Sequence, residues 1–163
     1  MLIGVVSDTH NNVKNIENII SLFNKNCVDL VLHTGDITNK TTLKRFSRLN
    51  CSLRGVFGNN DRCESGLLEI SSKYNFDFKD PPYTFSIKQK NIAMFHEPDG
   101  IEEFLKENRN IDIVLHGHTH RYREEIIENT VVFNPGESAG MIEGNNALGI
   151  IDLSNMTFKR IFF

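Results

Sequence analysis

Carboxylate, imidazole and amide side chains that could bind metal ions recur at five points of the chain. These side chains belong to Asp8, His10, Asp36, Asn59, His96, His118 and His120. Carboxylate and imidazole together suit divalent ions such as Mn²⁺, Fe²⁺, Zn²⁺ or Co²⁺, and seven donors exceed what one tetrahedral zinc needs. One shared carboxylate could bridge two ions about 4 Å apart, which is the arrangement of two-metal hydrolytic sites.

Glycines accompany three of these groups. They occur in Gly35-Asp36, Gly58-Asn59-Asn60-Asp61 and Gly117-His118-Thr119-His120. A glycine lets the backbone turn sharply, or come close to an ion, directly after a strand. Each group alone also has a plain reading as a turn, a helix cap or a packed histidine. Their occurrence in this order, each after an expected strand, favours a metal site over coincidence.

The elements that must position the first three groups follow a β-α-β-α-β pattern. Apolar runs predict strands at 2–6, 29–33 and 52–57, and apolar residues at helical spacing predict helices at 13–23 and 41–49. Such a pattern implies a parallel sheet with right-handed crossovers. Because ligands bind beyond the carboxyl ends of parallel strands, the polar loops can converge on one place.

The second half of the chain brings in antiparallel pairing. A helix is expected at 65–74, an extended loop at Pro81-Pro82 and a hairpin of strands 83–87 and 91–96 with the turn 88–90. Further expected elements are a helix at 101–108 and strands at 111–115, 123–127, 130–133, 147–153 and 157–162. We therefore expect one α/β domain over residues 1–163, with a mixed sheet or two packed sheets flanked by helices.

Composition excludes several classes of partner. Lys and Arg number 18 against 21 Asp and Glu, for a net charge of −3, which provides no footprint for non-specific nucleic-acid binding or for an anionic membrane. No apolar run reaches the ~20 residues of a membrane span, and the first residues do not resemble a signal peptide. Three cysteines without a Cys-x-x-Cys pair indicate reduced thiols and a cytoplasmic protein. A homodimer is expected only as the commonest oligomer.

Taken together, the five groups resemble those of the calcineurin-like metallophosphoesterase superfamily, over nearly the whole chain. The short length and the segment Asn134-Pro135-Gly136-Glu137-Ser138 are similar to its small phosphodiesterase branch in bacteria and archaea. The resemblance implies a four-layer α/β/β/α sandwich. It also implies one metal bound by Asp8, His10, Asp36 and His120, and another bound by Asp36, Asn59, His96 and His118, with Asp36 as the bridge.

Two positions depart from the superfamily pattern. Asn60 stands where phosphomonoesterases and protein phosphatases of the superfamily usually carry histidine. His96-Glu97-Pro98 replaces a common His-Gly-His or His-Gly. The Glu97 carboxylate could repel a phosphate or point away from it.

The implied activity is phosphodiester hydrolysis by a hydroxide that bridges two divalent ions. Two ions lower the pKa of a bound water, so hydroxide is available near neutral pH and can attack phosphorus in line. Mn²⁺ is the first expectation, with Ni²⁺, Zn²⁺, Fe²⁺ and Co²⁺ as alternatives. The catalytic candidates are Asn60, Asp36 and Asn59. Because Asn60 has no proton to give a poor leaving group, we expect a small-molecule phosphodiester as substrate rather than a monoester.

Two alternatives stay open: a phosphomonoesterase of the same superfamily, and a non-catalytic protein-binding scaffold that resembles the retromer subunit of this fold. All seven positions carry competent donors, which favours an enzyme. Binding of a nucleotide without hydrolysis would need a Gly-x-Gly-x-x-Gly or Walker loop, and neither occurs.

Other residues near these groups have two readings each. His33 and His116 either support a ligand or pack within a strand, and alternation along a strand would turn His116 to the side of His118. Arg62 and Arg121 either bind substrate phosphate or face solvent.

Overall fold

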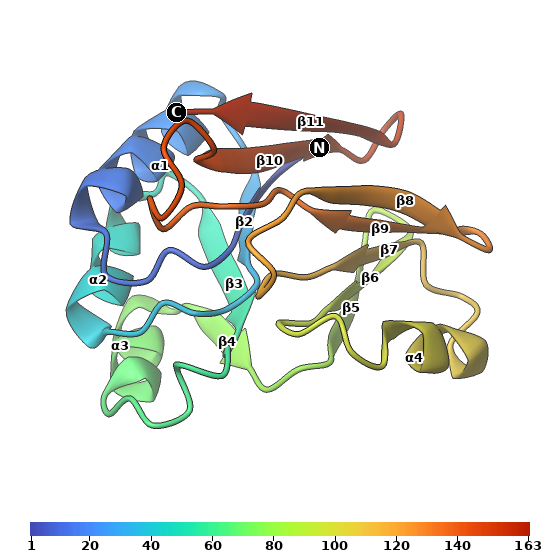
Figure 1. The fold of residues 1–163 in the computed structure, drawn as a ribbon, viewed down its shortest axis with the longest axis horizontal. Coiled ribbons are helices and arrows are strands. Elements are labelled where there is room, and N and C mark those ends of the chain that lie inside the picture. The colour runs from blue at the N-terminus through green and yellow to red at the C-terminus, as the bar shows by residue number, and fades with distance from the viewer.

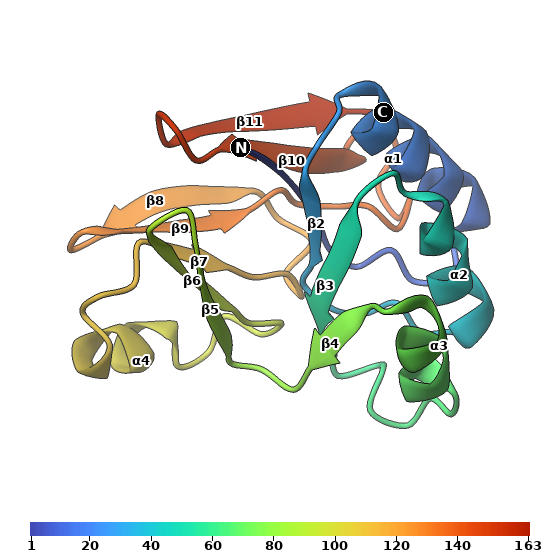
Figure 2. The same cartoon turned by 180° about the vertical axis from the view of Figure 1, so that it is seen from behind.

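Four layers stack in the computed structural model, which describes residues 1–163. Helices α1 (Val13–Lys25), α2 (Lys40–Arg45) and α3 (Leu67–Tyr74) cover the outer face of a six-stranded sheet (Figure 1). A five-stranded sheet packs against the inner face of the first, and α4 (Ile101–Glu107) lies on its far side, as the reverse view also shows (Figure 2). The expected α/β/β/α sandwich of two mixed sheets is confirmed.

The six-stranded sheet has the order β11-β10-β1-β2-β3-β4. Strands β1 to β4 are parallel, and β10 and β11 join antiparallel at the edge beside β1. The bounds are β1 (Leu2–Val6), β2 (Leu30–His33), β3 (Ser52–Val56), β4 (Asp77–Lys79), β10 (Ala147–Asp152) and β11 (Thr157–Phe162). The β-α-β-α-β opening is confirmed, whereas the three-residue β4 was not expected, because a segment that short has no recognisable period.

The five-stranded sheet has the order β5-β6-β7-β9-β8. Strands β6, β7 and β9 are parallel, and β5 and β8 are antiparallel edge strands. The bounds are β5 (Tyr83–Ile87), β6 (Lys90–Met94), β7 (Ile113–Leu115), β8 (Arg123–Ile127) and β9 (Thr130–Asn134). Ile87 pairs with Lys90, so the hairpin turn is the two residues Lys88-Gln89 rather than 88–90, and both have the positive φ of a type I′ turn.

Three apolar clusters fill the three spaces between the layers. The alternate side chains of β1 divide between two of them: Ile3 and Val5 face the second sheet, and Val6 faces the helices. Gly4 leaves room for the Phe23 ring, which would lie 2.5 Å from a Cβ at that position. A strand buried on both faces has a continuous apolar sequence, which is why β1 and β2 are easily recognised.

Local hydrogen bonds set the boundaries of the first two helices. Asn12 accepts a hydrogen bond from the Asn15 N–H and so begins α1. The expected helix at 41–49 is shorter: α2 ends at Arg45 and continues as a 3₁₀ turn, Phe46–Arg48. The structure has no helix long and apolar enough to cross a membrane.

Candidate metal centre

The first sheet supplies two carboxylates and one imidazole from the loops after β1 and β2. Asp8 is fully buried, and Asp36 is almost so. The Nε2 atom of His10 lies 4.0 Å from an Asp36 carboxylate oxygen. These loops are tied together, because the Asp8 N–H donates to the Gly35 carbonyl and the His10 N–H donates to the Asp36 carbonyl.

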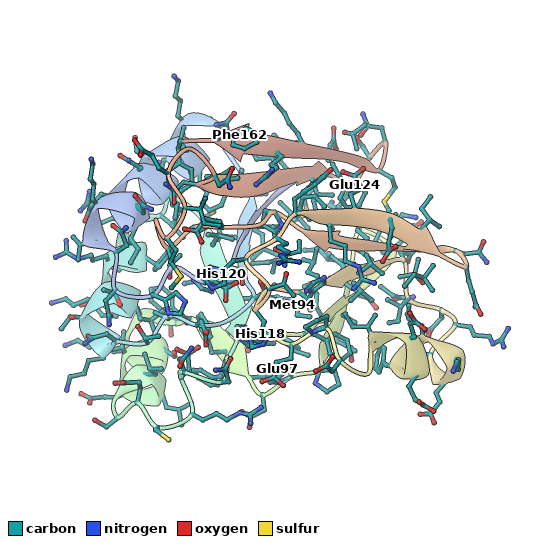
Figure 3. All side chains as sticks on the ribbon, viewed as in Figure 1. Met94, Glu97, His118, His120, Glu124 and Phe162 are labelled. Carbon is teal, nitrogen blue, oxygen red and sulfur yellow. The ribbon has the colours of Figure 1, made fainter.

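The second sheet supplies three imidazoles, two of which face those carboxylates. His96 Nε2 lies 3.5 Å from Asp36 Oδ2, and His120 Nε2 lies 3.6 Å from Asp8 Oδ1. The backbone N–H of His118 donates to the Asp8 carboxylate at 3.0 Å. His118 and His120 lie in the loop between β7 and β8 (Figure 3). The two sheets therefore meet at this point through polar contacts.

Asn59, after β3, completes the set. Its side-chain oxygen is 2.9 Å from His96 Nε2 and 3.1 Å from His118 Nδ1. All seven donors expected from the sequence thus converge on one place. Two groups have their ligand atoms within 4.8 Å of one another: Asp8 with His10 and His120, and Asp8 with Asp36 and His96. Asp8 joins both groups, while Asp36 Oδ2 lies 4.0 Å from His10 Nε2 and 3.5 Å from His96 Nε2.

Most of these residues are held in a costly backbone conformation. Positive φ angles, between 43° and 66°, occur at Asp8, His10, Asp36, His118 and His120. A left-handed backbone costs roughly 1–2 kcal/mol for a residue with a Cβ. Such a concentration is typical of a functional site, where surrounding contacts impose the conformation.

Two glycines stand where the ligand loops approach most closely. A Cβ on Gly58 would lie 2.2 Å from an Asp36 carboxylate oxygen. A Cβ on Gly117 would lie 1.8 Å from Ser7 Oγ and 2.7 Å from Asp8 Oδ2. Any side chain at either position would displace a carboxylate of the centre, so here the close approach requires glycine.

The buried carboxylate of Asp61 holds two of the loops in place. It accepts hydrogen bonds from the backbone N–H groups of Asp36, Ile37, Thr38 and Gly58, at 2.7 to 2.9 Å. The sequence placed Asp61 inside a motif but gave it no role. The only sequence feature that pointed to Asp61 was its position, three residues after Gly58 in the same loop.

Two candidate ligands are oriented through their Nδ1 atoms. His96 Nδ1 donates to the Thr34 carbonyl at 2.8 Å, and His120 Nδ1 lies 2.7 Å from the buried Glu137 carboxylate. Both contacts turn Nε2 towards the carboxylates, as is usual for histidine ligands of a metal. Glu137 was noted in the sequence only as part of 134–138, so its contact with His120 is a finding of the structure.

The donor set fits divalent cations. His10 Nε2 is buried and has no hydrogen-bond partner, and a buried polar atom without a partner is costly unless a ligand satisfies it. Burial raises the pKa of Asp8, because a carboxylate without enough cationic neighbours is unstable there. For Asp36, burial opposes ionisation, but hydrogen bonds from His96 and Asn60 hold its pKa below the usual range. A bound cation would compensate both carboxylates.

Asn60 holds Asp36 rather than standing free. Its side-chain amide donates to Asp36 Oδ2 at 2.7 Å and its backbone N–H donates to Oδ1 at 3.0 Å. Both Asp36 oxygens are therefore oriented by Asn60. The sequence did not predict this contact of the catalytic candidate.

His33 and His116 support the loops rather than joining the donors. His33 Nδ1 accepts the Gly35 N–H, and its Nε2 lies 3.0 Å from Thr9 Oγ1. His116 Nδ1 contacts the Gly117 carbonyl. Burial lowers the pKa of His33 to about 3 and that of His116 to about 4. The alternation expected to carry His116 to the side of His118 does not extend so far, because β7 ends at Leu115.

Comparison with known proteins supplies the family. The model of the calcineurin-like phosphoesterase superfamily domain matches residues 1–156. The chain belongs to this superfamily. The expectation of a metal-dependent phosphoric ester hydrolase is confirmed at that level.

Individual relatives of this phosphoesterase agree with the family. It is 31% identical to the phosphodiesterase MJ0936 of Methanocaldococcus jannaschii, over 99% of this chain and 98% of that protein. A solved structure described as a novel archaeal phosphodiesterase superimposes with a TM-score of 0.91 at 31% identity, covering both chains completely. A Vps29 variant from Entamoeba histolytica, at 17% identity, shares the fold with a TM-score of 0.70, over 100% of this chain and 99% of that one.

Glu137→Gln tests whether the phosphoesterase needs a carboxylate behind His120. The substitution replaces the carboxylate that orients the imidazole by a neutral amide. We therefore expect metal affinity, measured by calorimetric titration of Mn²⁺, to fall about 10- to 100-fold. Glu124→Gln is the matched control, because Glu124 is exposed on β8, away from His120 (Figure 3). Equal affinities of the two variants would contradict the role of Glu137.

The buried histidines predict a pH dependence of stability in the metal-free protein. Between pH 6.5 and about 3, unfolded His33 binds a proton that the folded form does not, so the free energy of unfolding falls as pH falls. A fully titrating group contributes about 1.4 kcal/mol per pH unit. Urea denaturation between pH 6 and 5 should show a smaller slope for His33→Gln than for the native chain, and an unchanged slope would rule out a neutral buried His33.

Proposed function

We propose that this chain is a phosphodiesterase that depends on two divalent ions. One ion is assigned to Asp8, His10, Asp36 and His120, and the other to Asp36, Asn59, His96 and His118. The observation that carries the proposal is the position of Asp36, whose Oδ2 atom lies within 4.0 Å of Nε2 of both His10, from the first sheet, and His96, from the second. Mn²⁺ is the ion we expect first, because mixed carboxylate, amide and imidazole donors suit it.

The chain's own residues prepare the site for such ions. When bound, two ions lower the pKa of a water and neutralise charge on the phosphate. Asn60 fixes both oxygens of Asp36, and the Thr34 carbonyl and Glu137 direct His96 and His120 inward. Asp61 keeps the loops after β2 and β3 at their working separation. The side chains are thus oriented before any ligand arrives, which is the preorganisation that catalysis requires.

Asn60 also supports the preference for diesters. An amide has no proton to give a leaving group near neutral pH, and the Asn60 amide is engaged with Asp36. An ester with a good leaving group suffers least from this lack. The relative MJ0936 is named a phosphodiesterase, which agrees with the same preference.

The cellular setting follows from the same proposal. Cys27, Cys51 and Cys63 are all free thiols, the state expected in a reducing compartment. We therefore assign the enzyme to the cytoplasm, acting on a small-molecule phosphodiester.

Metal-stripped protein should hydrolyse bis(4-nitrophenyl) phosphate only after a divalent ion is restored. Mn²⁺, Zn²⁺, Ni²⁺ and Mg²⁺ are added singly, and release of nitrophenolate is followed. Asp36→Asn should lose the activity, because a neutral amide replaces the carboxylate assigned to both ions. Folded native protein without turnover under any metal would overturn the proposal and favour a binding role for the fold.

Asn60→His should raise the ratio of monoester to diester turnover. An imidazole at this position can protonate a poor leaving group, a contribution of about 10²- to 10⁴-fold at best. The ratio is the quantity to measure, since the substitution also removes the contact with Asp36 and lowers both rates. Asn60→Gln is the control that keeps an amide, and a ratio equal in the two variants would refute the role of Asn60 in substrate choice.

A further inference from the structure

A cavity of about 460 Å³ lies between the loop at 57–66, the start of α3 and strand β4. Its apolar wall is formed by Phe57, Leu67, Leu68 and Phe78. Leu67 and Phe78 are buried, whereas Leu68 is 69% exposed at the rim. The volume falls in the range of small-ligand sites, and an exposed leucine beside such a cavity is available for contact with a ligand.

This cavity borders the candidate metal centre. Arg62 lines it and also lines a second hollow of about 240 Å³, whose wall includes the candidate ligand His96. Asp61, which lines the first cavity, binds the backbone N–H of Asp36 at 2.8 Å. Through Asp61 and Arg62, the cavity is therefore a neighbour of the metal centre.

The charges around the cavity favour an uncharged group. Arg62 and Lys79 are balanced by Glu64 and Asp80, and the Asp61 carboxylate is already occupied by four backbone N–H groups. A second phosphate would gain no net attraction there. Transfer of an apolar ring system from water to such an apolar wall is favourable, because the ring gives up no strong interactions with water.

The second hollow carries carboxylates of its own. Glu97 and Asp99 line it together with Arg62 and His96. A further anionic group beyond the centre would meet these carboxylates, so only the phosphate held at the centre is compatible with this surface. Arg62 lines both hollows, and its guanidinium is a group that binds phosphate well.

We propose that the cavity is a subsite for an aromatic, uncharged ester group of the phosphodiester, with Leu68 as a specificity-determining residue. The inference rests on the proposed function, since it assumes that the phosphate is held at the metal centre. It predicts that diesters with aryl groups bind more tightly than those with small alkyl groups.

Tryptophan fluorescence provides a direct test, because the chain contains no tryptophan. The Zn²⁺-loaded variant Leu68→Trp is titrated with diphenyl phosphate and with dimethyl phosphate. We expect a saturable change in emission with diphenyl phosphate alone. Ile126→Trp is the matched control, since Ile126 is 72% exposed on β8 of the other sheet. Equal responses to both diesters, or from both variants, would overturn the subsite.

Affinity gives the second measurement. Calorimetry should show diphenyl phosphate binding about tenfold more weakly to Leu68→Ser than to native protein, with dimethyl phosphate unaffected and Ile126→Ser unchanged. The two proposals fail separately. Selective fluorescence without hydrolysis would refute the phosphodiesterase and leave the subsite standing, whereas hydrolysis without selective binding would refute the subsite alone.

Discussion

Four backbone N–H groups converge on the buried carboxylate of Asp61, and the geometry of the centre depends on that convergence. The carboxylate joins the loop after β2 to the loop after β3, which brings Asp36 beside Asn59 and Asn60. Close approach of Gly58 to Asp36 follows from the same contact and leaves no room for a side chain. A single carboxylate bonded only to backbone thus fixes the position of another, that of Asp36.

The centre concentrates unfavourable features that the rest of the fold must offset. Asp8 is a buried carboxylate, five of the expected ligands have left-handed backbone, and His10 Nε2 is unpaired. Three apolar clusters between the four layers supply the stability against which these costs stand. The burial that stabilises the fold also strengthens the interactions between charges at the site, because charges interact more strongly away from water.

Much of this arrangement was predictable from the sequence, for identifiable reasons. Strands buried on both faces, such as β1 and β2, have continuous apolar runs, and polar residues directly after them stand out. Strand β4 was not predicted, because three residues are too few to show the alternation typical of a strand. The contacts of Asp61 with the loop after β2 span 23 to 25 residues, and the contact of Glu137 with His120 spans 17, so the local sequence pattern did not predict them. The contact between Asn60 and Asp36 likewise depends on a loop conformation that spacing does not specify.

The division of the donors between two sheets has a mechanical consequence. Asp8 and His118 touch across 110 residues of chain, one from each sheet. An ion bound by donors of both sheets would act as a cross-link between the two halves of the sandwich. The binding energy of the ion would then oppose separation of the two sheets, in addition to its part in the reaction. The rigidity of this molecule would vary with its metal supply.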